Sequence, residues 1–295
     1  MVKIHEYELK MMPKNPCILL IGRRRSGKSV NTMSLLYHYR STFKWGIAFV
    51  GSNASIRDYI KVMPSSFVYD QLDYDVLQGI IERQNKAANA GDPEQIFILI
   101  DDLAYSSEVF KHKLIKQCYA NGRHLGITLI ITTQYALAVP PLCRGNTDVV
   151  IASQEKSSIY RRKLFETFSI VFDRFSAFDK AYKACTQNYE SFIMVSCSDN
   201  QNDDVSSNCF FWKSQFPLPV FKINPNGRWW KLHARRHDPN GSTTTGQKGA
   251  IVKVPRRRHV AVPERTKNNE KKEESSGPIW IAKPVARRRG LSRFS

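Results

Sequence analysis

Residues 22–29 read Gly-Arg-Arg-Arg-Ser-Gly-Lys-Ser, which matches the phosphate-binding pattern G-x-x-x-x-G-K-[ST]. The apolar run at 17–21 precedes this loop and predicts a buried strand, and residues 30–40 predict a helix after it. In that strand–loop–helix order the backbone N–H groups of the loop turn inward and form a nest for an anion. The N-terminus of the helix adds partial positive charge at the same place. The loop therefore predicts a P-loop nucleotide-binding domain.

Each residue type in the loop has an expected role in holding ATP and Mg²⁺. Lys28 is expected to reach the outer phosphates and to act in catalysis, and the Ser29 hydroxyl is expected to bind Mg²⁺. The three arginines at 23–25 occupy the variable positions of the pattern, and we expect them to be solvated. The residues expected to bind the nucleotide are Gly22, Ser26, Gly27, Lys28, Ser29 and Val30.

Length and composition are those of a globular protein with a substantial core. At 295 residues the chain has room for one large α/β domain and an appendage, and 42% of its residues are hydrophobic. No apolar run approaches the roughly 18 residues that a membrane-spanning helix needs, and the N-terminus has no apolar signal segment. The six cysteines form no C-x-x-C pair, which predicts reduced thiols. These features predict a soluble intracellular protein with no membrane span.

The net charge of +19 is concentrated near the C-terminus. Residues 225–295 hold 18 lysines and arginines against 5 acidic residues, so they carry 13 of the 19 net positive charges. Periodicity disappears from about residue 224, and we expect a basic, largely disordered tail. Such a segment favours binding to nucleic acid, with a solubilising tail or a localisation signal as the alternative. The expected division is a lead-in strand or arm at 1–14, an ATPase domain at 15–224 and the tail at 225–295.

Apolar runs alternate with helix-compatible segments through the ATPase domain. Strands are expected at 15–21, 45–51, 96–100, 127–131 and 149–152, with an antiparallel pair near 191–197 and 208–213 at the sheet edge. Helices are expected at 30–40, 55–62, 72–90, 106–123, 156–168 and 174–186. This alternation predicts an α/β fold, in which helices flank a mostly parallel central sheet. In the tail, Trp229, Trp230 and Trp280 are expected either to dock on the core or to stack on bases.

The run at 96–100 leads directly into Asp101 and Asp102, which is the Walker B pattern. Parallel strands deliver their C-terminal ends to one edge of a sheet, where ligands bind. There Asp101 is expected to hold Mg²⁺, and Asp102 to orient or deprotonate the attacking water. Many ATPases have Glu at the second position, so with the shorter Asp102 either the water sits closer or the residue has a lesser role. An acidic helix cap at the strand end is the alternative.

The strand at 127–131 ends in Thr132, Thr133 and Gln134. If this strand lies between the P-loop strand and the Walker B strand, Gln134 is placed to sense the γ-phosphate through the attacking water. A polar turn is the alternative interpretation of these residues.

Two arginines flank the same strand, Arg123 before it and Arg144 after it. Charge builds on the γ-phosphoryl oxygens in the transition state, and an arginine from a neighbouring subunit stabilises it in many ATPases. Either Arg123 or Arg144 is a candidate for this catalytic role, and a plain surface arginine is the alternative for each.

An ordered set of motifs resembles the genome-packaging ATPases of large double-stranded DNA viruses, of the poxvirus type, which are similar to the FtsK and HerA DNA-pumping motors. The resemblance covers about residues 14–215. Its motifs are Gly22–Ser29, Gly51-Ser52-Asn53-Ala54, Pro64–Asp70, Ile80-Ile81-Glu82-Arg83-Gln84, Asp101-Asp102-Leu103, Asn121–Gly126, Thr132-Thr133-Gln134 and Arg144–Asp148.

The resemblance implies a RecA-like ATPase core that assembles into a ring, with a hexamer favoured. It implies movement of double-stranded DNA into a capsid, with capsid or portal-like proteins as partners. Such a protein acts inside the host cell, in a cytoplasmic viral factory or the nucleus, and is carried in the virion. The role of the tail is inferred from its charge alone.

Two other functions are compatible with the same motifs. One is an ATPase that assembles or secretes protein or filamentous phage, or that pumps DNA in conjugation. The other is a DNA-binding protein with a vestigial nucleotide site, against which the intact Lys28, Ser29, Asp101 and Asp102 argue.

Overall fold

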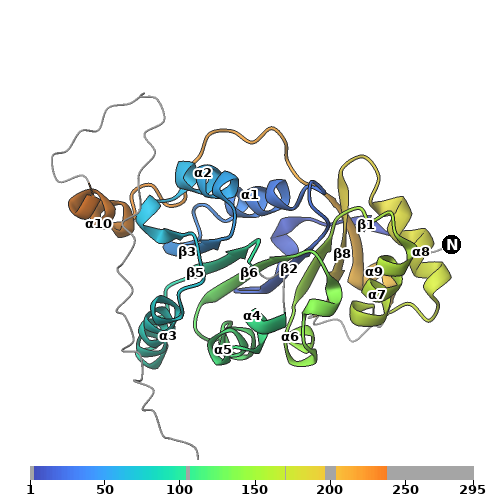
Figure 1. Ribbon diagram of the computed structural model, residues 1–295, viewed down its shortest axis with the longest axis horizontal. Helices are drawn as coiled ribbons and strands as arrows, with labels where there is room; N and C mark the ends of the chain where they lie inside the picture. The colour runs from blue at the N-terminus through green and yellow to red at the C-terminus, as the bar shows by residue number, and fades with distance from the viewer. Residues whose placement is uncertain (1–2, 104–106, 170, 197–203, 238–295) are drawn as a thin grey trace, which may run out of the picture. The chain divides into compact units, whose positions relative to one another are not determined.

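The computed structural model describes residues 3–103, 107–169, 171–196 and 204–237. They build one nine-stranded sheet with the strand order β1-β9-β8-β7-β2-β6-β5-β3-β4. Strands and helices alternate along most of the chain, so the expected α/β fold with a mostly parallel sheet flanked by helices is confirmed (Figure 1). The strands are β1 (His5–Glu6), β2 (Cys17–Ile21), β3 (Trp45–Val50), β4 (Val68–Tyr69), β5 (Ile96–Asp101), β6 (Ile127–Thr133), β7 (Val149–Ala152), β8 (Glu190–Val195) and β9 (Cys209–Lys213).

Helices cover both faces of the sheet. In Figure 1, α1 and α2 lie over one face, and α3, α5 and α6 lie over the other. The α-helices are α1 (Lys28–His38), α2 (Asn53–Val62), α3 (Tyr74–Asn89), α4 (Ser107–Lys111), α5 (Lys113–Asn121), α6 (Pro141–Gly145), α7 (Ser158–Phe168), α8 (Phe175–Cys185), α9 (Val205–Asn208) and α10 (Arg228–His237). The 3-10 helices are η1 (Leu9–Met11), η2 (Ser65–Phe67) and η3 (Ala136–Ala138).

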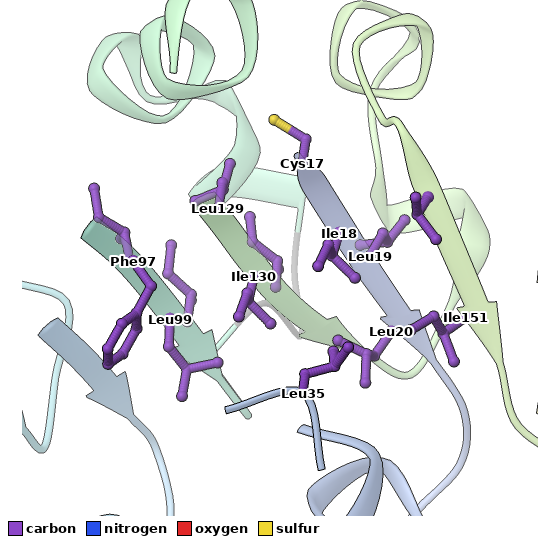
Figure 2. Close-up of a cluster of buried hydrophobic side chains, with 14 of the residues drawn as sticks. Cys17, Ile18, Leu19, Leu20, Leu35, Phe97, Leu99, Leu129, Ile130 and Ile151 are labelled. Atoms are coloured by element: carbon purple, nitrogen blue, oxygen red, sulfur yellow. The ribbon is translucent and has the colours of Figure 1, made fainter. Parts of the chain in front are cut away.

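The core lies around the central strands, which are apolar at almost every position. Every residue of β2, β5, β6 and β7 is buried, as parallel strands covered on both faces require. Figure 2 shows their side chains in one continuous cluster, with Leu35 of α1 packed beneath them. This rigid centre fixes the positions of the loops at the strand ends.

The order of the central strands places the sequence motifs. β6 pairs with β2 on one side and with β5 on the other, and all three run parallel. The insertion of this strand between the P-loop strand and the Walker B strand is therefore confirmed. β3, β4 and β7 also run parallel to them, so these six strands end at one edge of the sheet, which we call the carboxyl edge. The opposite edge, where these strands begin, is the amino edge.

Of the two alternatives for residues 1–14, the strand applies. The segment contains β1, which pairs with β9, and it buries Tyr7. β8 and β9 form the expected antiparallel pair, but β1 lies outside them and is the edge strand.

The expected helix at 106–123 is two helices, α4 and α5. The chain breaks at His112, whose ring stacks on Tyr74 of the neighbouring region and whose Nδ1 accepts a hydrogen bond from the Leu114 N–H. The imidazole thus caps the N-terminus of α5, so α4 and α5 do not join into one helix.

The low-order tail expected from residue 225 is wrong for its first part, because α10 forms there. Ile223 and Trp229 are buried, and the Trp229 ring packs edge-on against Phe67 of η2 with 5.5 Å between the ring centroids. The tryptophans are expected either to dock on the core or to stack on bases, and Trp229 docks on the core. Trp280 and the rest of the expected tail lie outside the described residues.

Two further findings concern the described residues. Five cysteines there are free and buried. In the same residues, no helix has both the length and the apolar character that crossing a membrane requires.

Candidate active site

The carboxyl edge brings together most of the residues singled out from the sequence. The P-loop follows β2, Asp101 ends β5, and Gln134 follows β6. Backbone hydrogen bonds tie these ends together: the Gly22 N–H donates to Thr133 O over 3.1 Å, and the Gly51 N–H donates to Asp101 O over 2.9 Å. The site therefore rests on the most buried part of the sheet.

The P-loop has the backbone that an anion nest requires. Gly27 adopts a left-handed conformation, with φ of 98°, and ends the loop at the start of α1. Its side of the loop is open, since a Cβ built there would have no atom within 4 Å. Gly27 has no side chain that could accept a hydrogen bond from the start of α1. The first N–H groups of the helix therefore remain available as donors to an anionic ligand.

Lys28 lies across this loop. Its Nζ donates to Gly22 O over 2.5 Å and to Arg23 O over 2.9 Å. Burial lowers the pKa of Lys28, Arg24 lowers it further, and the charges of Asp101 and Asp102 oppose the shift. The ammonium therefore lies within electrostatic reach of both acidic residues and of the loop that it is expected to serve.

Two buried hydroxyls lie beneath the P-loop. A Cβ on Gly22 would meet Ser26 Oγ, which would have to rotate away, and would lie 3.0 Å from Ser153 Cβ, so the loop packs closely on both serines. Among the described residues, Ser26 Oγ and Ser153 Oγ are buried side-chain atoms with no hydrogen-bond partner. Unsatisfied donors at the base of an open, left-handed loop fit a bound phosphate group.

Asp101 is the most enclosed acid of the site, with 2% of its surface exposed. Thr132 Oγ1 donates to its Oδ1 over 2.7 Å, and the Tyr59 hydroxyl donates to its Oδ2 over 2.9 Å. Two donors from β6 and α2 thus fix the plane of the carboxylate. Carboxylate and hydroxyl oxygens are the ligands that Mg²⁺ prefers, so Asp101 and the exposed Ser29 fit the metal role expected of them.

Toward Asp101, Tyr59 acts as a hydrogen-bond donor. It is 1% exposed, and burial, followed by the nearby Asp101 charge, raises the pKa of its phenol well above the ordinary value. The phenol therefore keeps its proton across the physiological range, and the carboxylate keeps its partner.

Asp102 lies in a strained backbone conformation. Its φ is 57°, in the left-handed region that Asp adopts more readily than most residues. The Asp102 N–H donates to Thr132 Oγ1 over 3.1 Å, so one threonine contacts both acidic residues. A Cβ on Gly51 would lie 2.5 Å from Asp102 O, so the end of β3 also confines this turn. Asp102 itself is exposed, as a group that meets a substrate water must be.

Gln134 is partly exposed at the end of β6, between the P-loop strand and the Walker B strand. It is the first residue after the end of β6, two positions beyond Thr132. The position suits the expected sensing role.

The arginines of the P-loop are exposed, as expected. Arg23 also lies 3.6 Å from Glu155, which follows β7. Arg25 has a positive φ of 62°, so it shapes the turn of the loop.

The structure does not bring Arg123 and Arg144 to the P-loop of the same chain. Arg123 precedes β6, and its carbonyl accepts a hydrogen bond from Asn15 before β2, which places it at the amino edge. Arg144 lies in α6, where its Nε donates to Val139 O over 2.7 Å. The Thr147 N–H donates to Arg144 O, close to the start of β7. A role for either arginine in the site of a neighbouring subunit stays a prediction.

Sequence reasoning missed two features of this site. Tyr59 is a helical residue with no motif around it, and only the packing of α2 against β3 and β4 brings it to Asp101. Thr132 belongs to a polar strand end that the sequence shows. Its contacts with both acids depend on the order of the strands, which the sequence does not determine.

Comparisons with known proteins agree with the viral character of the motifs. No protein-family model matches the chain. An uncharacterized protein, 088R, of invertebrate iridescent virus 3 is 27% identical over 228 residues, which cover 73% of this chain and 86% of the relative. Proteins of three further large DNA viruses match at 26–27% identity.

Solved structures share the architecture. The conjugation coupling protein TcpA of pCW3, solved with ATPγS, aligns with a TM-score of 0.52 at 16% identity, over 74% of this chain and 65% of that chain. The DNA-packaging ATPase B204 of Sulfolobus turreted icosahedral virus aligns with a TM-score of 0.49 at 19% identity, over 69% of this chain and 100% of that chain. The chain thus has a P-loop ATPase-like fold, and it is distantly homologous to proteins of large DNA viruses.

Proposed function

We propose that this protein is an ATPase that moves double-stranded DNA, and that it packages a viral genome into its capsid. The observation that carries the proposal is the position of β6, which brings Asp101, Asp102 and Gln134 to the edge where the P-loop lies. The viral relatives and the ordered motifs support the packaging role.

The residues divide the chemistry among them. The P-loop from Gly22 to Val30 would bind the phosphates of ATP, with Lys28 directed at the outer ones. Ser29 and Asp101 would hold Mg²⁺, which supplies charge neutralisation on the phosphates when bound. Asp102 would orient or deprotonate the attacking water, and Gln134 would register the γ-phosphate.

Assembly completes the proposed motor. A homo-oligomeric ring, with a hexamer favoured, would place Arg123 or Arg144 of one subunit against the phosphates held by the next. Double-stranded DNA would be held through its phosphates, and capsid or portal-like proteins would receive it. The work would take place inside the infected cell, in a cytoplasmic viral factory or the nucleus, and the protein would accompany the virion.

Measurement of ATP turnover in site variants tests the proposed chemistry. Lys28→Ala is expected to abolish hydrolysis, because the outer phosphates lose their cation. Asp102→Asn is expected to retain nucleotide binding and to lose about 10²-fold or more in turnover, the typical contribution of a general base.

Circular dichroism and thermal unfolding provide the control that both variants are folded. Hydrolysis retained by folded Lys28→Ala protein would contradict the nucleotide-site assignment. Turnover unchanged in Asp102→Asn would remove Asp102 from the water-activating role.

A further inference from the structure

The chain from 205 to 237 contains 6 lysines and arginines and no acidic residue. α10 lies within this stretch, beside η2 and away from the P-loop (Figure 1). Three exposed cations, Arg228, Lys231 and Arg235, follow one another at spacings of three and four residues, so they share one face of the helix. At 1.5 Å per residue this row spans about 10 Å.

Three further cations lie near α10 in other parts of the chain: Asn224 contacts the backbone carbonyls of two of them, and the guanidinium of Arg40 lies over Tyr37, 4.0 Å from the ring centroid. The Asn224 N–H donates to Arg40 O and its side chain donates to Lys44 O, each over 2.8 Å. Lys222 lies over the ring of Trp230, with 4.9 Å from Nζ to the ring centroid. The α10 basic surface, as we name it, consists of Arg40, Lys44, Lys222, Arg228, Lys231 and Arg235.

The surface is held rigidly from beneath. Trp229 packs on Phe67, and the Trp230 Nε1 donates to Ile223 O over 2.9 Å. His233 Nδ1 lies 3.0 Å from Ser66 Oγ. The cations are therefore carried by a docked helix with a fixed orientation.

Within the described residues, no ion pair joins a cation of the α10 basic surface to a carboxylate. Glu94, on the adjoining surface near Trp45, is paired with Arg83 over 2.8 Å. A row of exposed cations on a fixed support is complementary to a regularly charged polyanion.

The way α10 packs on the core argues against a membrane surface or another protein as its partner. A helix that binds a membrane surface needs its aromatic face free, and here Trp229 is buried at 3% exposure. A protein interface needs an apolar centre, and in the described part of α10 only Leu232 is an exposed large apolar residue.

We propose that the α10 basic surface binds the sugar–phosphate backbone of double-stranded DNA. The inference rests on the proposed function, because that function supplies the duplex. The surface adjoins the amino edge, since Arg40 follows α1 and Lys44 precedes β3. DNA held there leaves the P-loop accessible to nucleotide.

The test compares two triple variants of the full chain that remove equal charge. Arg228→Ala, Lys231→Ala and Arg235→Ala are combined in one protein. The control combines Lys113→Ala, Arg174→Ala and Lys180→Ala, which are exposed cations on or beside α5 and α8. Fluorescence anisotropy with a labelled duplex is measured over a series of NaCl concentrations.

The α10 variant is expected to bind at least tenfold more weakly at low salt. Its slope of log affinity against log salt is expected to fall by about two to three, since each lost phosphate contact contributes about 0.9. The control is expected to change the slope by less than one. Basal ATP turnover without DNA stays at the wild-type rate in both, because neither set of residues lies at the site.

Equal losses in the two variants would overturn the inference, because only total charge would then matter. A wild-type protein that binds phosphatidylserine vesicles through these residues, with duplex affinity unchanged in the α10 variant, would overturn it in favour of a membrane. Failure of the wild-type protein to bind duplex DNA at all would instead contradict the proposed function itself.

Discussion

At the residue scale, the site is organised around Asp101. Its two carboxylate oxygens accept hydrogen bonds from Tyr59 and Thr132, and Thr132 also accepts one from the Asp102 N–H. Asp101 and Asp102, for which we propose roles in metal binding and water activation, are therefore positioned by the same threonine. Of these hydrogen bonds, the one from Tyr59 can be removed with the least disturbance of the packing, because Phe has nearly the same shape as Tyr.

Removal of the Tyr59 hydroxyl is expected to impair the use of Mg²⁺. In Tyr59→Phe the Asp101 carboxylate loses one charge-assisted hydrogen bond, worth about 1.5–3 kcal/mol. We expect the Mg²⁺ concentration for half-maximal turnover to rise about tenfold, and nucleotide binding without Mg²⁺ to stay unchanged. Titration of ATPase activity with Mg²⁺ measures the first, and a fluorescent nucleotide measures the second.

Tyr119→Phe is the matched control, because Tyr119 is also buried and lies away from the carboxyl edge, near Cys17. It removes a hydroxyl that has no contact with Asp101. The same Mg²⁺ dependence in the two variants would show that Tyr59 contributes only to stability.

The sequence predicted Asp101 because an apolar run ending in acidic residues is a local pattern. Tyr59 could not be found in this way, since it is 42 residues distant along the chain from Asp101. Its role depends on how α2 packs, and no local pattern records that packing.

At the scale of elements, the ends of β3 and β5 meet through Gly51. The Gly51 N–H donates to Asp101 O, and its missing side chain leaves room for Asp102 O. The turn that carries Asp102, the proposed water-activating acid, thus packs closely against the end of β3.

Gly51→Ala is expected to displace Asp102 and to reduce turnover without unfolding the protein. The new Cβ would lie 2.5 Å from Asp102 O, so the backbone of the turn must move. A shift of this kind typically costs about 10²-fold in rate when it misplaces a catalytic group by about 1 Å. Steady-state ATPase assays measure the loss.

Gly79→Ala provides the comparison, because a Cβ there meets no atom within 4 Å. This change in α3 should leave turnover intact and stabilise the helix by about 0.5–1 kcal/mol. Wild-type turnover in Gly51→Ala would be inconsistent with the confined turn described here.

The helices α7 and α8 are joined by an ion pair between Arg161 and Asp179. The Arg161 side chain is 5% exposed, and it also donates to the carbonyls of Glu155 and Lys156. Hydrogen bonding from Arg161 lowers the pKa of Asp179, and Lys183 adds to the shift.

Asp179→Asn is expected to destabilise the protein by about 3 kcal/mol, because it leaves a buried guanidinium without its charge partner. A lowered pKa means that the pair stabilises the folded state above the ordinary Asp pKa of about 4. The stability gap between wild type and variant should close as the pH falls below that value. Urea unfolding over a pH series measures the gap.

The exposed pair of Lys163 and Glu166 serves as the control, because Glu166→Gln should cost about 0.5 kcal/mol or less. A stability difference between wild type and Asp179→Asn that does not change with pH would show that the loss is not due to the ion pair.

The alternating strands and helices were predictable because buried parallel strands are continuous apolar runs. The break at His112 and the helix α10 were not. His112 is fixed by its stacking on Tyr74, and α10 is fixed by burial of Trp229 against Phe67. In α10 the sequence pattern is dominated by cations, so the helix emerges only from a tertiary contact that the local sequence does not encode.

At the scale of the molecule, the two proposed sites lie in different parts of the described chain. The proposed nucleotide site lies at the carboxyl edge, and the α10 basic surface lies beside η2, near the starts of the strands. The elements between them are the buried central strands and α1, which begins at the P-loop and ends two residues before Arg40, whose carbonyl accepts a hydrogen bond from the Asn224 N–H. In the proposed motor, this arrangement would allow hydrolysis at one place to act on DNA held at another.

The central claim is that duplex DNA and ATP hydrolysis are coupled in this protein. Turnover of the wild-type protein measured with and without duplex DNA, at low and at high NaCl, tests it most directly. We predict that the duplex accelerates hydrolysis at low salt, that NaCl suppresses the acceleration, and that Lys28→Ala abolishes it. Identical turnover with and without duplex at low salt would contradict the account.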